Sequence, residues 1–157
     1  MKEIKLTQGL VTLVDDEDFD WLSQWKWLAY KGHSTFYAAR HPEGPHKGRK
    51  LVFMHRQILN CTDDEQGDHE DHNGLNNQRY NLRSCTHTQN LFNKIPRGKS
   101  KYLGVEVRKS GSFHARIRID KKRVFLGAFK TEEEAAHAYD KVAKIYHGEF
   151  ANLNFKD

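Results

Sequence analysis

The sequence has few residues that could crosslink the chain and no long apolar run. Its two cysteines among 157 residues, Cys61 and Cys85, are too far apart for a CxxC clip, which predicts free thiols in a reducing compartment. No apolar stretch approaches the roughly 18 residues that a membrane helix needs, and the first residues, MKEIKLTQG, lack the apolar centre of a signal peptide. We therefore expect a soluble, intracellular, cytoplasmic protein without a membrane partner.

The sequence also lacks the aromatic RNP motifs and the GXXG clamp of common RNA-binding folds, which argues against an RNA-binding protein. What it has is positive charge, with a formal net charge of +5. Residues 1–90 carry 11 Lys/Arg against 13 Asp/Glu, a net of −2, and residues 91–157 carry 15 against 8, a net of +7. A basic segment beside a neutral-to-acidic one predicts a region that binds an acidic partner, joined to a region with another role.

Hydrophobic periodicity predicts an α+β chain made of two small domains. In the first half, strands are expected around residues 4–6, 10–14, 25–30, 35–40 and 51–54, with a helix over 15–24 and a turn over 41–49. In the second half, strands are expected over 102–109, 112–120 and 123–129, followed by a helix over 131–147 with a Thr131/Glu134 capping box. One helix face should be buried through Ala135, Ala138, Tyr139 and Val142. The predicted domains are 1–92 and 102–157, joined by a basic linker over 93–101.

The polar segment 61–84 cannot be a core element, so it invites a functional interpretation. Hydrolysis of a phosphodiester needs a divalent cation and a base that activates water. The adjacent pair Asp68 and His69 can supply an oxygen ligand and a base. A second oxygen ligand must come from elsewhere in the chain, and Asn90 on the next expected helix is well placed.

This constellation resembles the HNH homing endonuclease family, whose pattern is DH, about a dozen residues, NLR and then a helix that bears Asn. The resemblance implies that His69 is the general base, that Asp68 and Asn90 hold Mg²⁺ or Mn²⁺, and that Asn81 orients His69. It also matches Met54-His55-Arg56 to the start of the helix before the site. The implied fold is a ββα-metal unit: a strand ending at His69, a strand around residues 81–83, and a helix from about Thr86.

Other interpretations of these residues stay open. The segment could be a polar loop stabilised by Asn and Asp turns. Asp71 and His72 fit a turn better than an alternative ligand pair. A structural zinc on Cys61, Cys85 and His87 is conceivable, although the CxxC pairs of zinc-bearing relatives are absent.

In the second half, apolar residues alternate with polar and mostly basic ones along 113–120, so one sheet face should be apolar and the other cationic. A solvated basic face is the alternative to a binding face. The segments YLGVEVRKSGSFHARIRI, RVFLGAFKTEEEAAHAYDKVA and GEFANLNF resemble the AP2 domain of plant transcription factors. The resemblance implies contacts with double-stranded DNA by Arg108, Arg116, Arg118, Arg123 and Phe125. Lys99, in the basic linker outside this match, is expected to contact phosphate. Glu106 and Arg116 depart from the family pattern, where Arg and Glu are usual, so the plant target site is not expected.

Together these features predict a site-specific, metal-dependent DNA endonuclease of the homing type. One site per chain cuts one strand, so a monomer without an obligate protein partner should nick DNA. The resemblance points to a bacterial or phage-infected host. The alternative is a DNA-binding regulator with an inactive nuclease domain.

Overall fold

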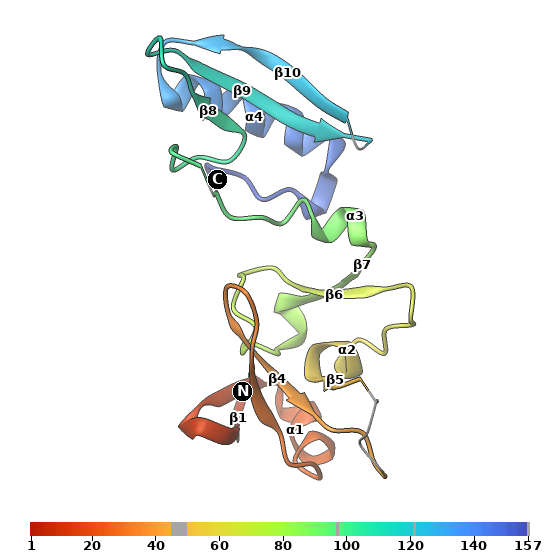
Figure 1. Cartoon of the computed structure of the whole chain (residues 1–157). Helices are drawn as coiled ribbons and strands as arrows, with labels where there is room; N and C mark the ends of the chain where they lie inside the picture. Colours follow the sequence, from red (N-terminus) through yellow and green to blue (C-terminus); the bar gives the residue numbers. More distant parts are fainter. Residues whose placement is uncertain (45–49, 97, 121, 157) are drawn as a thin grey trace. The chain divides into compact units, whose positions relative to one another are not determined.

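The computed structural model describes residues 1–44, 50–96, 98–120 and 122–156 (Figure 1). The chain divides into two compact units, Met1–His87 and Thr88–Asp157, each described here by itself. Both mix helices with small antiparallel sheets, so the predicted α+β class is confirmed. The predicted turn 41–49, the linker 93–101 and the turn before the last strand each lie partly outside the described residues. The predicted domain bounds 1–92, 93–101 and 102–157 stay a prediction.

The first unit begins with a hairpin and a short helix. Strands β1 (Lys2–Lys5) and β2 (Val11–Val14) pair antiparallel and are joined by the 3-10 turn η1 (Thr7–Gly9). Gln8 and Gly9 both adopt left-handed backbone conformations, with φ of 66° and 72°, which confirms the predicted break between the strands. Helix α1 (Asp16–Leu22) has three acidic residues in its first turn, where they interact favourably with the helix dipole.

A three-stranded sheet and a short helix complete the core of this unit. The strands β3 (Leu28–Lys31), β4 (Phe36–Arg40) and β5 (Val52–Phe53) lie in that order. The expected strand 51–54 is shorter than predicted, because Met54 already begins helix α2 (Met54–Ile58). The core of the unit gathers side chains from all of these elements; its most deeply buried large members are Val14, Leu22, Trp27 and Met54.

The polar segment forms a two-stranded antiparallel sheet of β6 (Gln66–His69) and β7 (Leu82–Cys85). The 3-10 turn η2 (Arg79–Asn81) precedes β7 directly. Helix α3 (His87–Asn90) follows β7, and the division between the two units falls inside it. Neither Cys61 nor Cys85 forms a disulfide bond, as predicted.

The second unit is a sheet of β8 (Val105–Val107), β9 (Phe113–Ile119) and β10 (Lys122–Phe129), in the order β10-β9-β8, with helix α4 (Glu132–Tyr146) along one face (Figure 1). The 3-10 turn η3 (Gly148–Phe150) follows the helix. The Thr131/Glu134 capping box is confirmed, and both of its hydrogen bonds are present. The first strand is shorter than predicted: Gly104, with φ of 72°, lies just before β8.

The buried face of α4 is partly different from the prediction. Ala135 and Tyr139 are buried as expected, but Ala138 and Val142 are only partly buried. Ala136, Asp140 and Ala143 are buried instead. The polar Asp140 is buried because its carboxylate accepts hydrogen bonds from the backbone N–H groups of Asn154 and Phe155, which ties the C-terminal segment to the helix.

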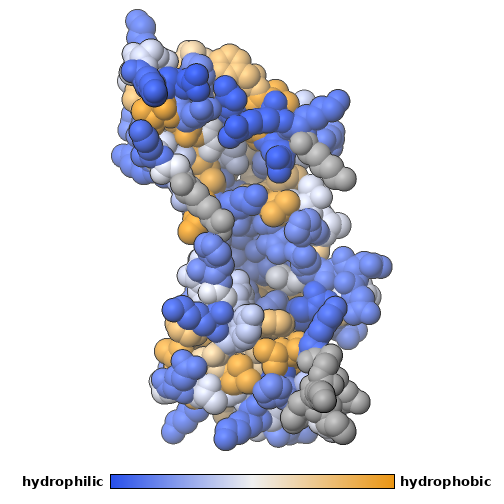
Figure 2. All heavy atoms as spheres, viewed as in Figure 1, coloured by the Kyte–Doolittle hydropathy of each residue, from blue (hydrophilic) through white to orange (hydrophobic). Residues whose placement is uncertain are grey.

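Polar residues cover most of the visible surface, and apolar residues are exposed only in small separate groups (Figure 2). None of the helices in the described part of the chain has the length and apolar content that crossing a membrane requires.

Candidate active site and nucleic-acid interface

Asp68 and His69 end strand β6, and both side chains are buried, with exposed fractions of 6% and 5%. In the strand register, Asp68 pairs with Arg83 and His69 with Leu82 of β7. The Arg83 guanidinium makes an ion pair with Oδ2 of Asp68, with Nε at 2.9 Å and Nη2 at 2.8 Å. The hairpin therefore pairs the Asp68 carboxylate with a guanidinium, at the position next to His69 in the strand.

The His69 ring lies among other rings. Its centroid is 4.8 Å from that of His55 on α2 and 5.8 Å from that of Tyr37 on β4. Burial lowers the pKa of His69 below the usual value, although a hydrogen bond with Asn77 and the charges of Asp71 and Asp68 act in the opposite direction. A neutral imidazole with a free lone pair is the form that can accept a proton.

The side chain that hydrogen-bonds with the ring is Asn77, whose Oδ1 lies 3.2 Å from Nε2 of His69. Sequence reasoning missed Asn77. The side chain of Asn81, assigned this orienting role by resemblance, bonds with the loop instead. Its Nδ2 donates to Oδ1 of Asp71 and the carbonyl of Asn76, and its Oδ1 accepts from the backbone N–H of Asp71. Asn81 therefore braces the loop that follows His69, and its role in orienting the ring stays a prediction.

The turn interpretation of residues 71 and 72 is confirmed. His72 has a left-handed backbone with φ of 63°. The Asp71 carboxylate accepts hydrogen bonds from the backbone of Asn73 and the side chain of Asn76, as Asx turns do.

Asn90, the second expected metal ligand, is the last residue of α3 and is half-buried. It belongs to the second unit and Asp68 to the first, so their joint action on a metal stays a prediction. The described residues gather no group of three or more His, Cys, Asp or Glu side chains that could hold a metal. Asp68 and Asn90 would offer oxygen atoms, the kind of ligand that Mg²⁺ prefers, and that ion can bind through one or two side chains together with water and phosphate.

In the second unit, four of the residues expected to contact DNA share the sheet face opposite α4: Arg116, Arg118, Arg123 and Phe125. Directly paired residues of antiparallel strands lie on the same face. The register pairs Arg123 with Arg118 and Phe125 with Arg116. Phe125 is 54% exposed, while the neighbouring Ala115 and Ile117 on the other face are buried. This face therefore presents arginines and an aromatic ring together.

Glu106 interrupts the positive charge of this face. Its Oε1 accepts a hydrogen bond from Nη1 of Arg108 at 2.8 Å, and its Oε2 lies 3.2 Å from Nε of Arg116 in an ion pair. The hydrogen bond from Arg108, together with the nearby charge of Arg116, lowers the pKa of Glu106. The carboxylate holds the two guanidiniums in place in the free protein. Lys99, the expected phosphate contact, is exposed in the segment before β8.

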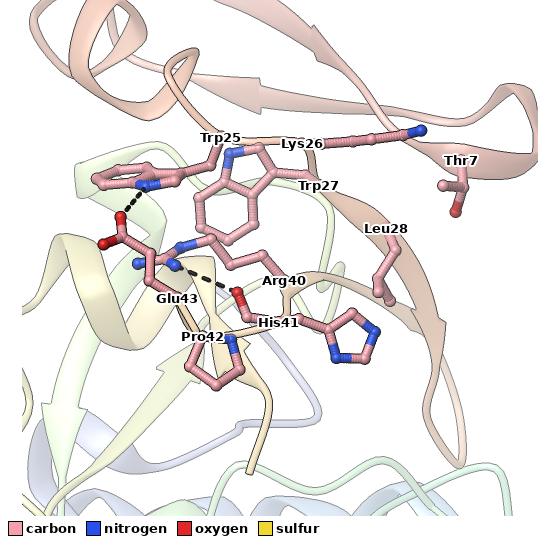
Figure 3. Close-up of a pocket in the computed structure, with 9 residues that line it drawn as sticks. All are labelled: Thr7, Trp25, Lys26, Trp27, Leu28, Arg40, His41, Pro42 and Glu43. Atoms are coloured by element: carbon pink, nitrogen blue, oxygen red, sulfur yellow. Dashed lines mark hydrogen bonds between the residues drawn. The ribbon is translucent and has the colours of Figure 1, made fainter. Parts of the chain in front are cut away.

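A separate pocket of about 420 Å³ in the first unit contains none of the expected catalytic residues (Figure 3). The Arg40 guanidinium stacks 4.3 Å from the ring centroid of Trp25 and donates to the carbonyl of His41. Nε1 of Trp25 donates to Glu43 at 3.3 Å. The Arg40 guanidinium and the Glu43 carboxylate are thus each bonded to another residue of the pocket.

Known proteins resemble the chain in both parts, although no protein-family profile matches it. An uncharacterized HNH endonuclease of Acanthamoeba polyphaga mimivirus is 30% identical over 147 residues, which cover 94% of this chain and 76% of the relative. An APETALA2-like protein of Oryza sativa subsp. indica is 45% identical over 62 residues, 38% of this chain. An ethylene-responsive transcription factor of Medicago truncatula is 43% identical over 61 residues, also 38% of this chain. The chain spans only 14% and 26% of the lengths of these two plant proteins. These matches support both resemblances, and the chain belongs to the HNH endonuclease family.

Proposed function

We propose that the protein is a site-specific, divalent-metal-dependent DNA endonuclease that nicks one strand. The observation that carries the proposal is the buried pair Asp68 and His69 on β6, in which the His69 imidazole is hydrogen-bonded to the uncharged amide of Asn77. Burial favours the neutral ring, which is the form that takes a proton from water. The mimivirus relative, an HNH endonuclease by name, supports the same chemistry.

In this mechanism His69 removes a proton from the attacking water, and the Asp68 carboxylate and Asn90 amide would hold Mg²⁺ or Mn²⁺. When bound, such an ion supplies positive charge for the phosphate. Asn81 keeps the loop after His69 in one conformation through its bonds with Asp71 and Asn76. Arg83 pairs with Asp68 in the free protein and would supply a second positive charge for a phosphate bound at this carboxylate.

Binding of duplex DNA is proposed for the exposed sheet face of the second unit. Arg108, Arg118, Arg123 and Phe125 are exposed on it, and Arg116 is partly so. Arginine can bind guanine through two parallel hydrogen bonds in the major groove, which gives sequence preference. The AP2 relatives include transcription factors by name, which supports this assignment. A monomer with one catalytic site should act on one strand at a time.

Nicking of supercoiled plasmid, with and without Mg²⁺, tests the nuclease. His69→Ala should lose roughly 10²–10⁴-fold in rate and keep its DNA affinity, because the arginines lie in the other unit. The matched control is His33→Ala, at an exposed position in the turn between β3 and β4. Full activity in a folded His69→Ala protein would remove His69 from the mechanism.

The metal ligands are tested by titrating the ion. Asp68→Ala and Asn90→Ala should each raise the concentration of Mg²⁺ or Mn²⁺ that gives half-maximal nicking, because each removes an oxygen ligand. Nicking that persists in excess EDTA would refute the metal mechanism.

The DNA contacts are tested by binding to a specific and a scrambled duplex at two salt concentrations. Arg118→Ala should weaken specific binding by about 1–3 kcal/mol and relax the preference at one base pair. Lys99→Ala should weaken both duplexes equally and lower the salt slope by roughly 0.9. Equal losses from both variants on both duplexes would show that Arg118 does not read a base.

One observation favours the second candidate, a DNA-binding regulator without nuclease activity. The Arg83 guanidinium already neutralises the Asp68 carboxylate, which a metal ligand must offer to the ion. Specific DNA binding with no nicking at any concentration of Mg²⁺ or Mn²⁺ would select this candidate.

A further inference from the structure

The Asn77 side chain is fully buried and lies between His69 and strand β2. Its Nδ2 donates to Oγ1 of Thr12 at 2.7 Å and lies 3.5 Å from the carbonyl of Gly74. Its Oδ1 faces Nε2 of His69 at 3.2 Å. Thr12 is also fully buried, so these groups have no solvent to exchange partners with.

The orientation of the Asn77 amide follows from its neighbours. Thr12 has one hydroxyl proton, which it donates to the carbonyl of Leu75 at 2.8 Å, so its oxygen must accept from the amide. Rotating the amide by 180° would place its oxygen toward the Gly74 carbonyl. It would also take the hydroxyl proton away from Leu75 and leave two oxygens 2.8 Å apart without a hydrogen between them. The nitrogen therefore faces Thr12, and the oxygen faces His69.

The backbone keeps the amide in this place. The N–H of Asn77 donates to the carbonyl of Leu13 at 2.8 Å, and the N–H of Leu13 donates to the carbonyl of Leu75 at 2.9 Å. The segment 75–77 is thereby fixed to β2 on both sides of the Thr12 contact.

An amide oxygen only accepts hydrogen bonds, so Nε2 of His69 must be the donor. A neutral imidazole has one N–H, and its other nitrogen then carries a lone pair that can accept a proton. We propose that Asn77, oriented by Thr12, is a positioning residue that holds neutral His69 in the Nε2–H tautomer and makes Nδ1 the proton acceptor of the nuclease. The catalytic part of this inference rests on the proposed function; the tautomer of His69 does not.

The tautomer can be measured directly in the full chain by nitrogen NMR of ¹⁵N-histidine-labelled protein, since protonated and unprotonated ring nitrogens have well-separated shifts. The spectra are recorded above the ordinary titration range of histidine, and His69→Ala assigns the signal. His147 is an internal reference: its Nε2 lies 3.0 Å from the carbonyl of Arg118, which fixes the same tautomer in the second unit.

Wild-type His69 should show a protonated Nε2. Asn77→Asp retains an acceptor for Nε2 but loses the N–H that faces Oγ1 of Thr12, so it should keep this tautomer in part. Asn77→Leu removes the acceptor and should give a mixture. Thr12→Val preserves the shape of the threonine but not its hydroxyl, and it should also give a mixture of tautomers. This variant replaces Asn77→Leu as the test if Asn77→Leu does not fold. The His147 signal should be the same in every variant.

In the nicking assay, Asn77→Leu should lower kcat roughly 10–100-fold, as loss of an orienting hydrogen bond does, with KM unchanged and partial rescue in Asn77→Asp. The proposal would be overturned if wild-type His69 carried its proton on Nδ1. It would also be overturned if His69 kept the Nε2–H tautomer unchanged in folded Asn77→Leu or, where that variant does not fold, in Thr12→Val. A wild-type Nε2–H ring in a protein that never nicks DNA would reject the nuclease and leave the Asn77 assignment of the tautomer standing.

Discussion

His55 makes the first unit sensitive to acid. Its ring is 7% exposed, and Nδ1 has no hydrogen-bond partner among the described residues. Burial lowers its pKa from 6.5 to about 3, and the positive charges of protonated His69 and of Arg56 act in the same direction. A lowered pKa in the folded protein means that the unfolded chain binds the proton more readily. The stability contributed by neutral His55 is therefore complete above about pH 6.5 and is lost as the pH falls toward 3.

The size of the effect follows from the two pKa values. Between pH 8 and pH 5, protonation of the unfolded chain alone should lower the free energy of unfolding by about 2 kcal/mol for this residue. His69, whose pKa is also lowered by burial, adds to the same slope. Replacing His55 with Phe should remove only the pH dependence that His55 contributes. It breaks no hydrogen bond of Nδ1, which has no partner among the described residues.

Tryptophan fluorescence reports this unit alone, because all three tryptophans lie between residues 21 and 27. Urea unfolding at pH 8 and pH 5 should show a loss of stability that is about 2 kcal/mol smaller in His55→Phe than in the wild type. His33→Phe, at an exposed turn position, should retain the wild-type loss. Equal losses in His55→Phe and the wild type would refute the view that His55 is buried as a neutral ring.

Two further predictions concern stability. Arg79→Ala removes the guanidinium that binds both carboxylate oxygens of Asp18. Because Asp18 is 1% exposed but Arg79 is 49% exposed, the change should cost about 1–3 kcal/mol in urea unfolding. A loss below about 1 kcal/mol would mean that the pair behaves like a surface ion pair. Gly104→Ala would place its Cβ in steric overlap with the ring of Tyr139, whereas Gly111→Ala, also at positive φ, meets no described atom within 4 Å. Thermal unfolding of the second unit should therefore show a loss of at least about 2 kcal/mol for Gly104→Ala and about 1 kcal/mol for Gly111→Ala, and equal losses would contradict the close packing.

Local patterns predicted most of the elements, because alternation and capping depend on neighbouring residues. The register of β9 against β10 also follows from alternation, which is why Arg116 and Arg118 lie on the expected face. The face of α4 was harder to predict. Alanine occurs on both buried and exposed helix faces, so its presence does not show which face is buried. Asp140 is buried because it bonds with Asn154 and Phe155, which are distant in the sequence.

The site was predictable only as far as its motif reaches. Asp68 and His69 were recognised from their spacing to later residues, but Asn77 and Thr12 were not. Their contact depends on how β2 lies against the loop, and no local pattern gives that register. The dipeptide Asn76-Asn77 beside a DH motif was the available sign, since buried asparagines must have polar partners.

The bond between Thr12 and Asn77 joins residues 65 positions apart in the sequence. Closing so long a loop costs conformational entropy before any contact forms, and such non-local pairing slows folding. The β6–β7 hairpin is local by comparison and can form without β2. During refolding, the His69 backbone should therefore reach its paired position before its ring is oriented. A local opening that frees only the first strands would disorient the imidazole while the hairpin stays hydrogen-bonded.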